Sequence, residues 1–261
     1  MKSGIITTYI TAFAAIAFSL SAVRAGETSG KAITPPEDDL SSYIYMDAWA
    51  ASLKGNIGVA GRTSSIDVGF DDIVDNLDAA FAGGFGFQKG KWGLLTEVFW
   101  LKVSTDAPTP GSLFKRADIG VEQVMVDGHI SYRFFECPQG KGHLDVIGGA
   151  RYMYMDTTLG FVPGAAPRRI NVGGSESWWD AYGGIKGRYD INDKWFLPFR
   201  GDVGGGDSSL VWQAIAGVGY QFDSGFDMRL AYRYMSYDYS GGGFTYDVET
   251  HGPIFIVGYS F

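Results

Sequence analysis

Histidine and cysteine carry much of the acid–base, nucleophilic and metal chemistry of proteins, and this chain has only three His and one Cys in 261 residues. Near a predicted strand end, His251 has several acids close by in the sequence, namely Asp238, Asp247 and Glu249. A histidine beside carboxylates can act in general acid–base catalysis. However, acids in a loop are usually only solvated, and neither a Gly-x-Ser-x-Gly nor a His-Glu-x-x-His motif occurs. We therefore expect no catalytic residue, no metal site and no cofactor, and keep the residues around His251 as an alternative.

Charged residues are more numerous, and they alternate with apolar ones. In the segment 226–239, for example, Phe226, Met228 and Leu230 alternate with Asp227 and Arg229. Successive side chains of a β-strand point to opposite faces, so such a segment predicts a strand with one apolar and one charged face. The charged face of the predicted strands carries Glu97, Asp127, His129, Arg133, Asp145, Arg151, Asp180, Lys186, Arg188, Arg200, Asp202, Asp227, Arg229 and Arg233.

Ten segments are of the length that a tilted strand needs to cross a membrane. They are 43–59, 78–88, 91–104, 121–135, 143–156, 177–191, 194–206, 208–222, 226–239 and 250–261. The first is the weakest, because Asp47 interrupts its apolar face. Aromatic residues make up 15% of the chain, and 38 residues are glycine. Such a composition is typical of membrane barrels. The sequence predicts an all-β fold, a single closed antiparallel transmembrane β-barrel of about ten strands, with eight or twelve strands as alternatives.

The connections between these segments alternate between short and long, apart from a tight glycine turn at 204–208. Short periplasmic turns opposite long outer loops are typical of outer-membrane barrels. The predicted long loops are 60–77, 105–120, 157–176 and 240–249. In the first of these loops Phe70, Ile73, Val74 and Leu77 recur at helical spacing, which predicts a short helix at the outer mouth.

The chain ends on an alternating strand that places Phe255, Val257, Tyr259 and Phe261 on one face. This ending resembles the C-terminal targeting strand of bacterial outer-membrane barrels. The barrel assembly machinery reads such strands by their last Phe and by the aromatic residue two positions before it. The resemblance identifies these four residues as a candidate assembly signal.

Three stretches, 187–196, 216–220 and 232–234, extend this likeness. With them the mature chain resembles the small, poorly characterised β-barrel proteins of the proteobacterial outer membrane. The resemblance implies a location in the outer membrane of a Gram-negative bacterium. It also implies contact with outer-membrane lipid and lipopolysaccharide, and with the barrel assembly machinery during biogenesis.

The N-terminus predicts export. Lys2, an apolar run and the small residues before Ala25 are typical of a signal peptide, so we expect Sec-type export and cleavage after residue 25. Residues 26–42 then form a flexible periplasmic lead-in to a barrel of residues 43–261. Removal of residues 1–25 takes away two basic residues and no acidic one, so the formal charge changes from −8 to −10. This acidity argues against binding to nucleic acid.

Ten strands enclose a narrow interior, in which charged side chains must be paired. The sequence therefore predicts a structural or narrow-channel protein with no catalysis. A basic excess would favour small anions if the interior conducts. The alternative from another class is an outer-membrane enzyme, a protease or a lipid-modifying enzyme, that acts from the extracellular rim near His251.

Overall fold

The computed structural model of this chain describes residues 40–59, 62–108 and 112–261. The predicted signal peptide and nearly all of the predicted lead-in lie outside these residues. The strands are β1 Leu40–Trp49, β2 Ser52–Val59, β3 Arg62–Val68, β4 Leu77–Lys89, β5 Trp92–Pro108, β6 Phe114–Glu136, β7 Gly142–Pro163, β8 Ile170–Asp190, β9 Trp195–Gly206, β10 Ser208–Gln221, β11 Phe226–Gly241 and β12 Phe244–Ser260. The helices are α2 Phe70–Asp75 and the 3-10 turn η1 Pro138–Gly140. None of the helices described is long and apolar enough to span a membrane.

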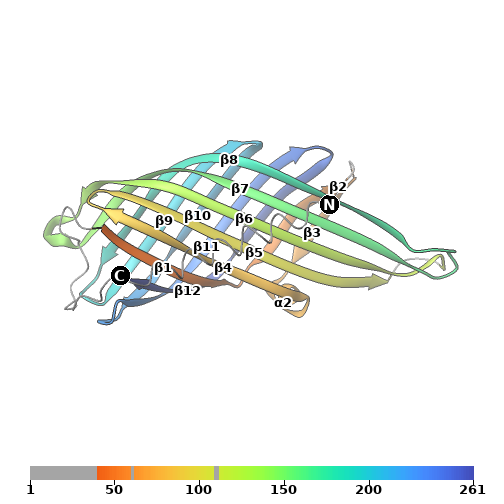
Figure 1. Cartoon of the computed structure of the whole chain (residues 1–261), viewed down its shortest axis with the longest axis horizontal. Helices are drawn as coiled ribbons and strands as arrows, with labels where there is room; N and C mark the ends of the chain where they lie inside the picture. The colour runs from red at the N-terminus through yellow and green to blue at the C-terminus, as the bar shows by residue number, and fades with distance from the viewer. Residues whose placement is uncertain (1–39, 60–61, 109–111) are drawn as a thin grey trace.

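The strands form a closed antiparallel ring (Figure 1). From β4 to β12 each strand pairs with the next in the sequence, and β1 joins the two ends of this series by pairing with both β4 and β12. The register of the closing pair runs from Tyr43 opposite Ser260 to Trp49 opposite Ile254. The ring therefore contains ten strands, which confirms the predicted all-β barrel and its strand number.

The first predicted strand, 43–59, is wrong in detail, because it is two strands interrupted at Ala50 and Ala51. β1 pairs with the last part of β12, whereas β2 pairs with its earlier part, residues 245–251. β3 then pairs with β2 and lies within the predicted loop 60–77. The sequence of β3 is mostly polar, and only Ile66 and Val68 form a short apolar face. Asp47 does not break an outward face, because it lies on the inward face of β1 with Tyr45.

The predicted long loops are also wrong in detail, because most of their residues belong to strands. β5 and β6 remain paired as far as Pro108 and Arg116, and β7 and β8 remain paired as far as Phe161 and Ile170. These ribbons form the long extension at the right of Figure 1. The remaining loop 60–77 contains the predicted helix, which is present as α2.

The outward face of the ring is apolar along its whole circumference. Large exposed side chains there include Ile130, Ile185, Val203, Leu230 and Phe255. Aromatic residues such as Trp92, Phe134 and Trp195 gather at the end with the short turns, which we call the short-turn end. Apolar side chains facing outwards and aromatic rings at the strand ends suit a lipid bilayer and its interface.

Candidate functional site: the barrel interior

The interior of the barrel is layered along its axis, as the inward residues of β11 illustrate. From the short-turn end, Arg229 lines a cavity, Arg233 belongs to a group of ion pairs, and Met235 and Tyr237 belong to an apolar cluster. We call these layers the vestibule, the central charge cluster and the aromatic–methionine layer. Because inward residues recur every second position, each long strand contributes to more than one layer.

The central charge cluster consists of three arginines and three carboxylates, namely Arg151, Arg200, Arg233, Glu97, Asp127 and Asp202. Glu97, Asp127 and Arg151 stand opposite one another on the adjacent strands β5, β6 and β7. Strand pairing thus brings together charges that are far apart in the sequence. The formal charges of the six side chains cancel.

Arg200 connects the carboxylates of this cluster. Its guanidinium nitrogens lie 2.8 Å from Asp202, 3.1 Å from Asp127 and 4.0 Å from Glu97. Arg151 contacts Asp127 at 2.8 Å and Asp202 at 3.2 Å. Arg233 contacts Glu97 at 2.7 Å. Removing one member would leave buried charge uncompensated, which is far more costly than loss of an exposed ion pair.

Neutral side chains satisfy further hydrogen bonds of the cluster. The Tyr45 hydroxyl donates to Glu97 at 3.0 Å, and the Tyr182 hydroxyl donates to Asp127 at 2.7 Å. Gln213 links two charged residues, because it donates to Asp202 at 2.7 Å and accepts from Arg233 at 3.1 Å. The sequence analysis missed these three residues. Alternation places each of them on the same face as charged residues of its own strand, so their inward orientation could have been predicted.

Gly149 makes room for Tyr182. In the strand register it stands between His129 on β6 and Tyr182 on β8. A Cβ atom at this position would lie only 2.7 Å from the Tyr182 hydroxyl and 2.2 Å from the Gly128 carbonyl oxygen. A residue with a Cβ atom here would therefore clash with the backbone of β6 and with the Tyr182 hydroxyl, and one of them would have to shift.

The aromatic–methionine layer fills the interior on the long-ribbon side of the central charge cluster. Its buried members are Met125, Met153, Met155, Trp178, Val211, Met235, Tyr237, Tyr239, Phe244, Tyr246 and Val248. Trp178 lies at its centre, stacked on Tyr239 with the ring centroids 4.2 Å apart and edge-on to Tyr237 at 6.4 Å. Trp49 and Leu53 of β1 and β2 also pack against the layer. The sequence analysis missed this layer, because the inward face was recognised by its charged residues and these inward residues are apolar.

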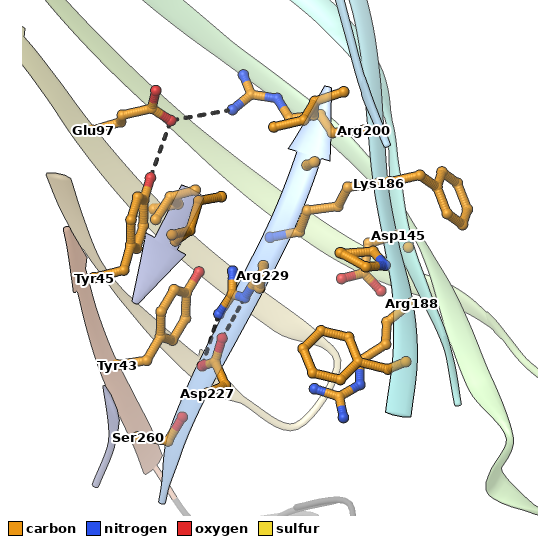
Figure 2. Close-up of a pocket in the computed structure, with 18 of the residues that line it drawn as sticks. Tyr43, Tyr45, Glu97, Asp145, Lys186, Arg188, Arg200, Asp227, Arg229 and Ser260 are labelled. Atoms are coloured by element: carbon orange, nitrogen blue, oxygen red, sulfur yellow. Dashed lines mark hydrogen bonds and ion pairs between the residues drawn. The ribbon is translucent and has the colours of Figure 1, made fainter. Parts of the chain in front are cut away.

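The vestibule is a cavity of about 350 Å³ at the short-turn end (Figure 2). Its boundary runs from Ser42 and Ser260 near the end of the barrel to Glu97 and Arg200 of the central charge cluster. Ion pairs also occur in its wall. Arg133 contacts Asp145 at 3.3 Å, Arg188 contacts Asp190 at 2.7 Å, and Arg229 contacts Asp227 at 3.0 Å.

The structure places twelve of the fourteen predicted inward charges in two groups and the other two, His129 and Asp180, outside them. Six form the central charge cluster. Another six line the vestibule: Arg133, Asp145, Lys186, Arg188, Asp227 and Arg229. His129 lies between the two groups, with Nδ1 3.7 Å from Asp127 and Nε2 3.4 Å from the Lys186 ammonium. Asp180 stands apart, because it accepts hydrogen bonds from the backbone and hydroxyl of Ser208 at 2.8 and 2.7 Å.

The candidate assembly signal lies on the outward face of β12 and at the end of the chain. Phe255 and Phe261 are exposed, and Val257 and Tyr259 are partly exposed. Tyr259 packs edge-on against Phe261, with the ring centroids 4.9 Å apart. The backbone N–H of Phe261 donates to Ser42 at 2.8 Å, which ties the end of the chain to β1.

His251 lies outside the interior, on the outward side of β12. Its ring stacks on Tyr234 with centroids 5.6 Å apart, and its Nδ1 lies 2.8 Å from the Tyr232 hydroxyl. No carboxylate of the described part of the chain lies within 4 Å of this imidazole. The acids near it in the sequence are therefore not assembled around it, and Asp238 and Asp247 face each other farther along the β11–β12 ribbon.

No protein-family model and no curated protein sequence matches the chain. Several solved structures match the chain in fold. The outer membrane protease OmpT from Escherichia coli has 12% identity and a TM-score of 0.48, with 89% of this chain and 99% of that chain covered. The translocator domain of the autotransporter NalP from Neisseria meningitidis has 12% identity and a TM-score of 0.43, with 98% and 96% covered. The attachment invasion locus protein Ail of Yersinia pestis has 11% identity and a TM-score of 0.35, with 86% and 99% covered.

At such identities and TM-scores these likenesses carry no argument about activity, and the strand pairing is the evidence for the fold. A closed ring leaves no unpaired edge in the hydrocarbon, which is the condition for a β-sheet to span a bilayer. An apolar outer face around buried charges is the arrangement of barrels in bacterial outer membranes. The chain is an outer-membrane β-barrel protein with buried charge pairs inside.

Proposed function

We propose that this protein is a sealed, structural barrel of the outer membrane that conducts no ions in its resting state and performs no catalysis. The observation that supports this most directly is that two successive layers occupy the interior. Arg151, Asp127 and Trp178 are all almost completely buried. An ion crossing the barrel would have to displace a neutral group of ion pairs and also a packed aromatic cluster.

The position of His251 favours this proposal over the enzymatic alternative. The enzymatic alternative needs carboxylates close to His251 to assist it in general acid–base catalysis, and none in the described part of the chain lies within 4 Å of its imidazole. The ring of His251 is instead packed among tyrosines at the lipid-facing surface. The proposal also includes assembly by the barrel assembly machinery, and contact of the outward apolar face with lipid and lipopolysaccharide.

The test is single-channel recording in planar bilayers. We expect the wild-type protein to be silent. The single variants Arg200→Ala and Trp178→Ala are also expected to be silent, because one layer remains in each. The double variant is expected to show small discrete steps, since both layers are then incomplete.

Discrete steps from the wild-type protein would contradict the sealed barrel, and anion selectivity of those steps would support a narrow channel instead. The folded state of the double variant is checked by its shift on unheated electrophoresis gels. If the folded double variant is silent, the two layers do not form the seal.

A further inference from the structure

The vestibule has the size and position of a ligand site. Its volume of about 350 Å³ is within the range of small-molecule pockets, and the central charge cluster closes its inner end. Figure 2 shows Tyr43, Lys186 and Arg229 pointing into the same central space from different parts of the wall. The short-turn end faces the periplasm in outer-membrane barrels, so a ligand would enter from there.

One basic side chain in the lining of the vestibule has no ion pair with the described residues. Its lining contains six basic and four acidic side chains. Its arginines all have a carboxylate partner within 4 Å. Two of these partners, Asp127 and Asp190, lie outside the lining, so the larger number of basic lining residues is not a net charge. Lys186 is the basic lining residue that remains without a carboxylate partner within 4 Å among the residues that the structure describes.

Lys186 has no carboxylate within 4 Å in the described chain, and its contact is the Nε2 atom of His129 at 3.4 Å. An ammonium group has three donors, so two remain for another partner. Asp145 stands opposite Lys186 in the register, but its carboxylate lies closer to Arg133, at 3.3 Å, and to His143, at 3.9 Å. Asp47 also lines the cavity, but its carboxylate does not lie within 4 Å of the Lys186 ammonium.

The rest of the lining is largely apolar. Leu95, Phe199, Ile215, Ala231 and Ile254 contribute to it. This surface can accept the body of a ligand but offers it no hydrogen bond. A bare inorganic anion would leave this surface without a partner, whereas an anion with a compact apolar body would cover it.

We propose that the vestibule binds small organic carboxylates with a compact apolar body, and that Lys186 holds the carboxylate. The ammonium group donates a charge-assisted hydrogen bond to the ligand, which is stronger than a bond between neutral groups. The apolar wall holds the body of the ligand. This site does not depend on whether the barrel conducts, because its entrance and its lining lie on one side of the central charge cluster.

The test is isothermal titration calorimetry with the purified protein in octyl glucoside micelles, with benzoate as the probe. We expect the wild-type protein to bind benzoate and to bind benzamide and benzylamine at least tenfold more weakly. We expect Lys186→Met to bind benzoate at least tenfold more weakly than the wild type. The matched control is Lys194→Met, because Lys194 lies in the turn between β8 and β9 with Asp223 as its partner, and we expect it to leave the affinity unchanged.

Equal affinity of Lys186→Met and wild type for benzoate would overturn the proposal, and so would a loss of affinity in Lys194→Met of the same size. Absence of benzoate binding by the wild type at millimolar concentration would overturn it as well. If Lys186→Met does not fold, the comparison of the three probes on the wild type decides, since equal binding of benzylamine and benzoate contradicts a site built on an ammonium group.

Discussion

Arg200 illustrates how much of the interior depends on a single side chain. Its guanidinium group lies within 4.0 Å of all three carboxylates of the central charge cluster. Alternation along the strand was enough to predict that Arg200 faces inwards. Alternation also places Asp202 beside it, two positions along β9. Its partners Glu97 and Asp127 could not be predicted, because they lie on β5 and β6 and depend on strand pairing far apart in the sequence.

At this scale we predict that Arg200→Ala destabilises the barrel by about 3–5 kcal/mol, because it leaves carboxylates buried without their counter-charge. Urea unfolding of the protein in lipid vesicles measures this difference. The control is Arg116→Ala. The side chain of Arg116 is 54% exposed and forms an ion pair with Asp118 at 2.9 Å. Its cost should be about 0.2–1 kcal/mol. Equal unfolding midpoints for the two variants would contradict a structural role of the central charge cluster.

Among the elements, β8 shows how one strand separates lipid from interior. Trp178 and Trp179 are neighbours in sequence and point to opposite sides of the wall. Trp178 is 1% exposed in the aromatic–methionine layer, whereas Trp179 is 58% exposed on the outward face beside Tyr152. Their identical chemistry makes them a matched pair for measuring what burial in the interior contributes.

We expect Trp178→Ala to destabilise the barrel by about 3–5 kcal/mol, the range for removal of a large aromatic side chain from a packed core. Trp179→Ala should cost much less, because its ring leaves no enclosed cavity behind. The measurement is again urea unfolding in vesicles. A larger loss for Trp179→Ala would show that the outward girdle, and not the filled interior, dominates stability.

The elements that the sequence did not predict have a common physical origin. In β1 both faces carry aromatic or apolar residues. The sequence therefore did not show which face is inward, and Asp47 was interpreted as an interruption of the lipid-facing side instead of as an inward residue. In β3 the residues Thr63, Ser64 and Ser65 form no apolar face, and the strand exists because it pairs with β2. The ribbons of β5 to β8 likewise rise beyond the apolar zone, where pairing continues although the alternation of apolar residues fades.

For the whole molecule, we propose that the end of the chain acts as a signal during assembly, in addition to its place in the folded barrel. We predict that Phe261→Ala lowers the fraction of protein that reaches its folded form in the outer membrane of living cells. Phe134→Ala is the control, because both side chains are outward and similarly exposed, at 60% and 54%. Gel-shift analysis of outer-membrane fractions with and without heating gives the folded fraction. Equal folded fractions for the two variants would contradict a signal at the C-terminus.

The pairing of Tyr43 with Ser260 closes the ring, and its formation limits how quickly the barrel can fold. The contact that closes the ring joins residues from nearly opposite ends of the chain, so its loop-closure entropy is among the largest available to this fold and its formation is slow. Until it forms, β1 and β12 each expose an edge of unpaired backbone groups, which invites association with other chains. Copies in which the seam has not yet closed are therefore the most vulnerable to aggregation.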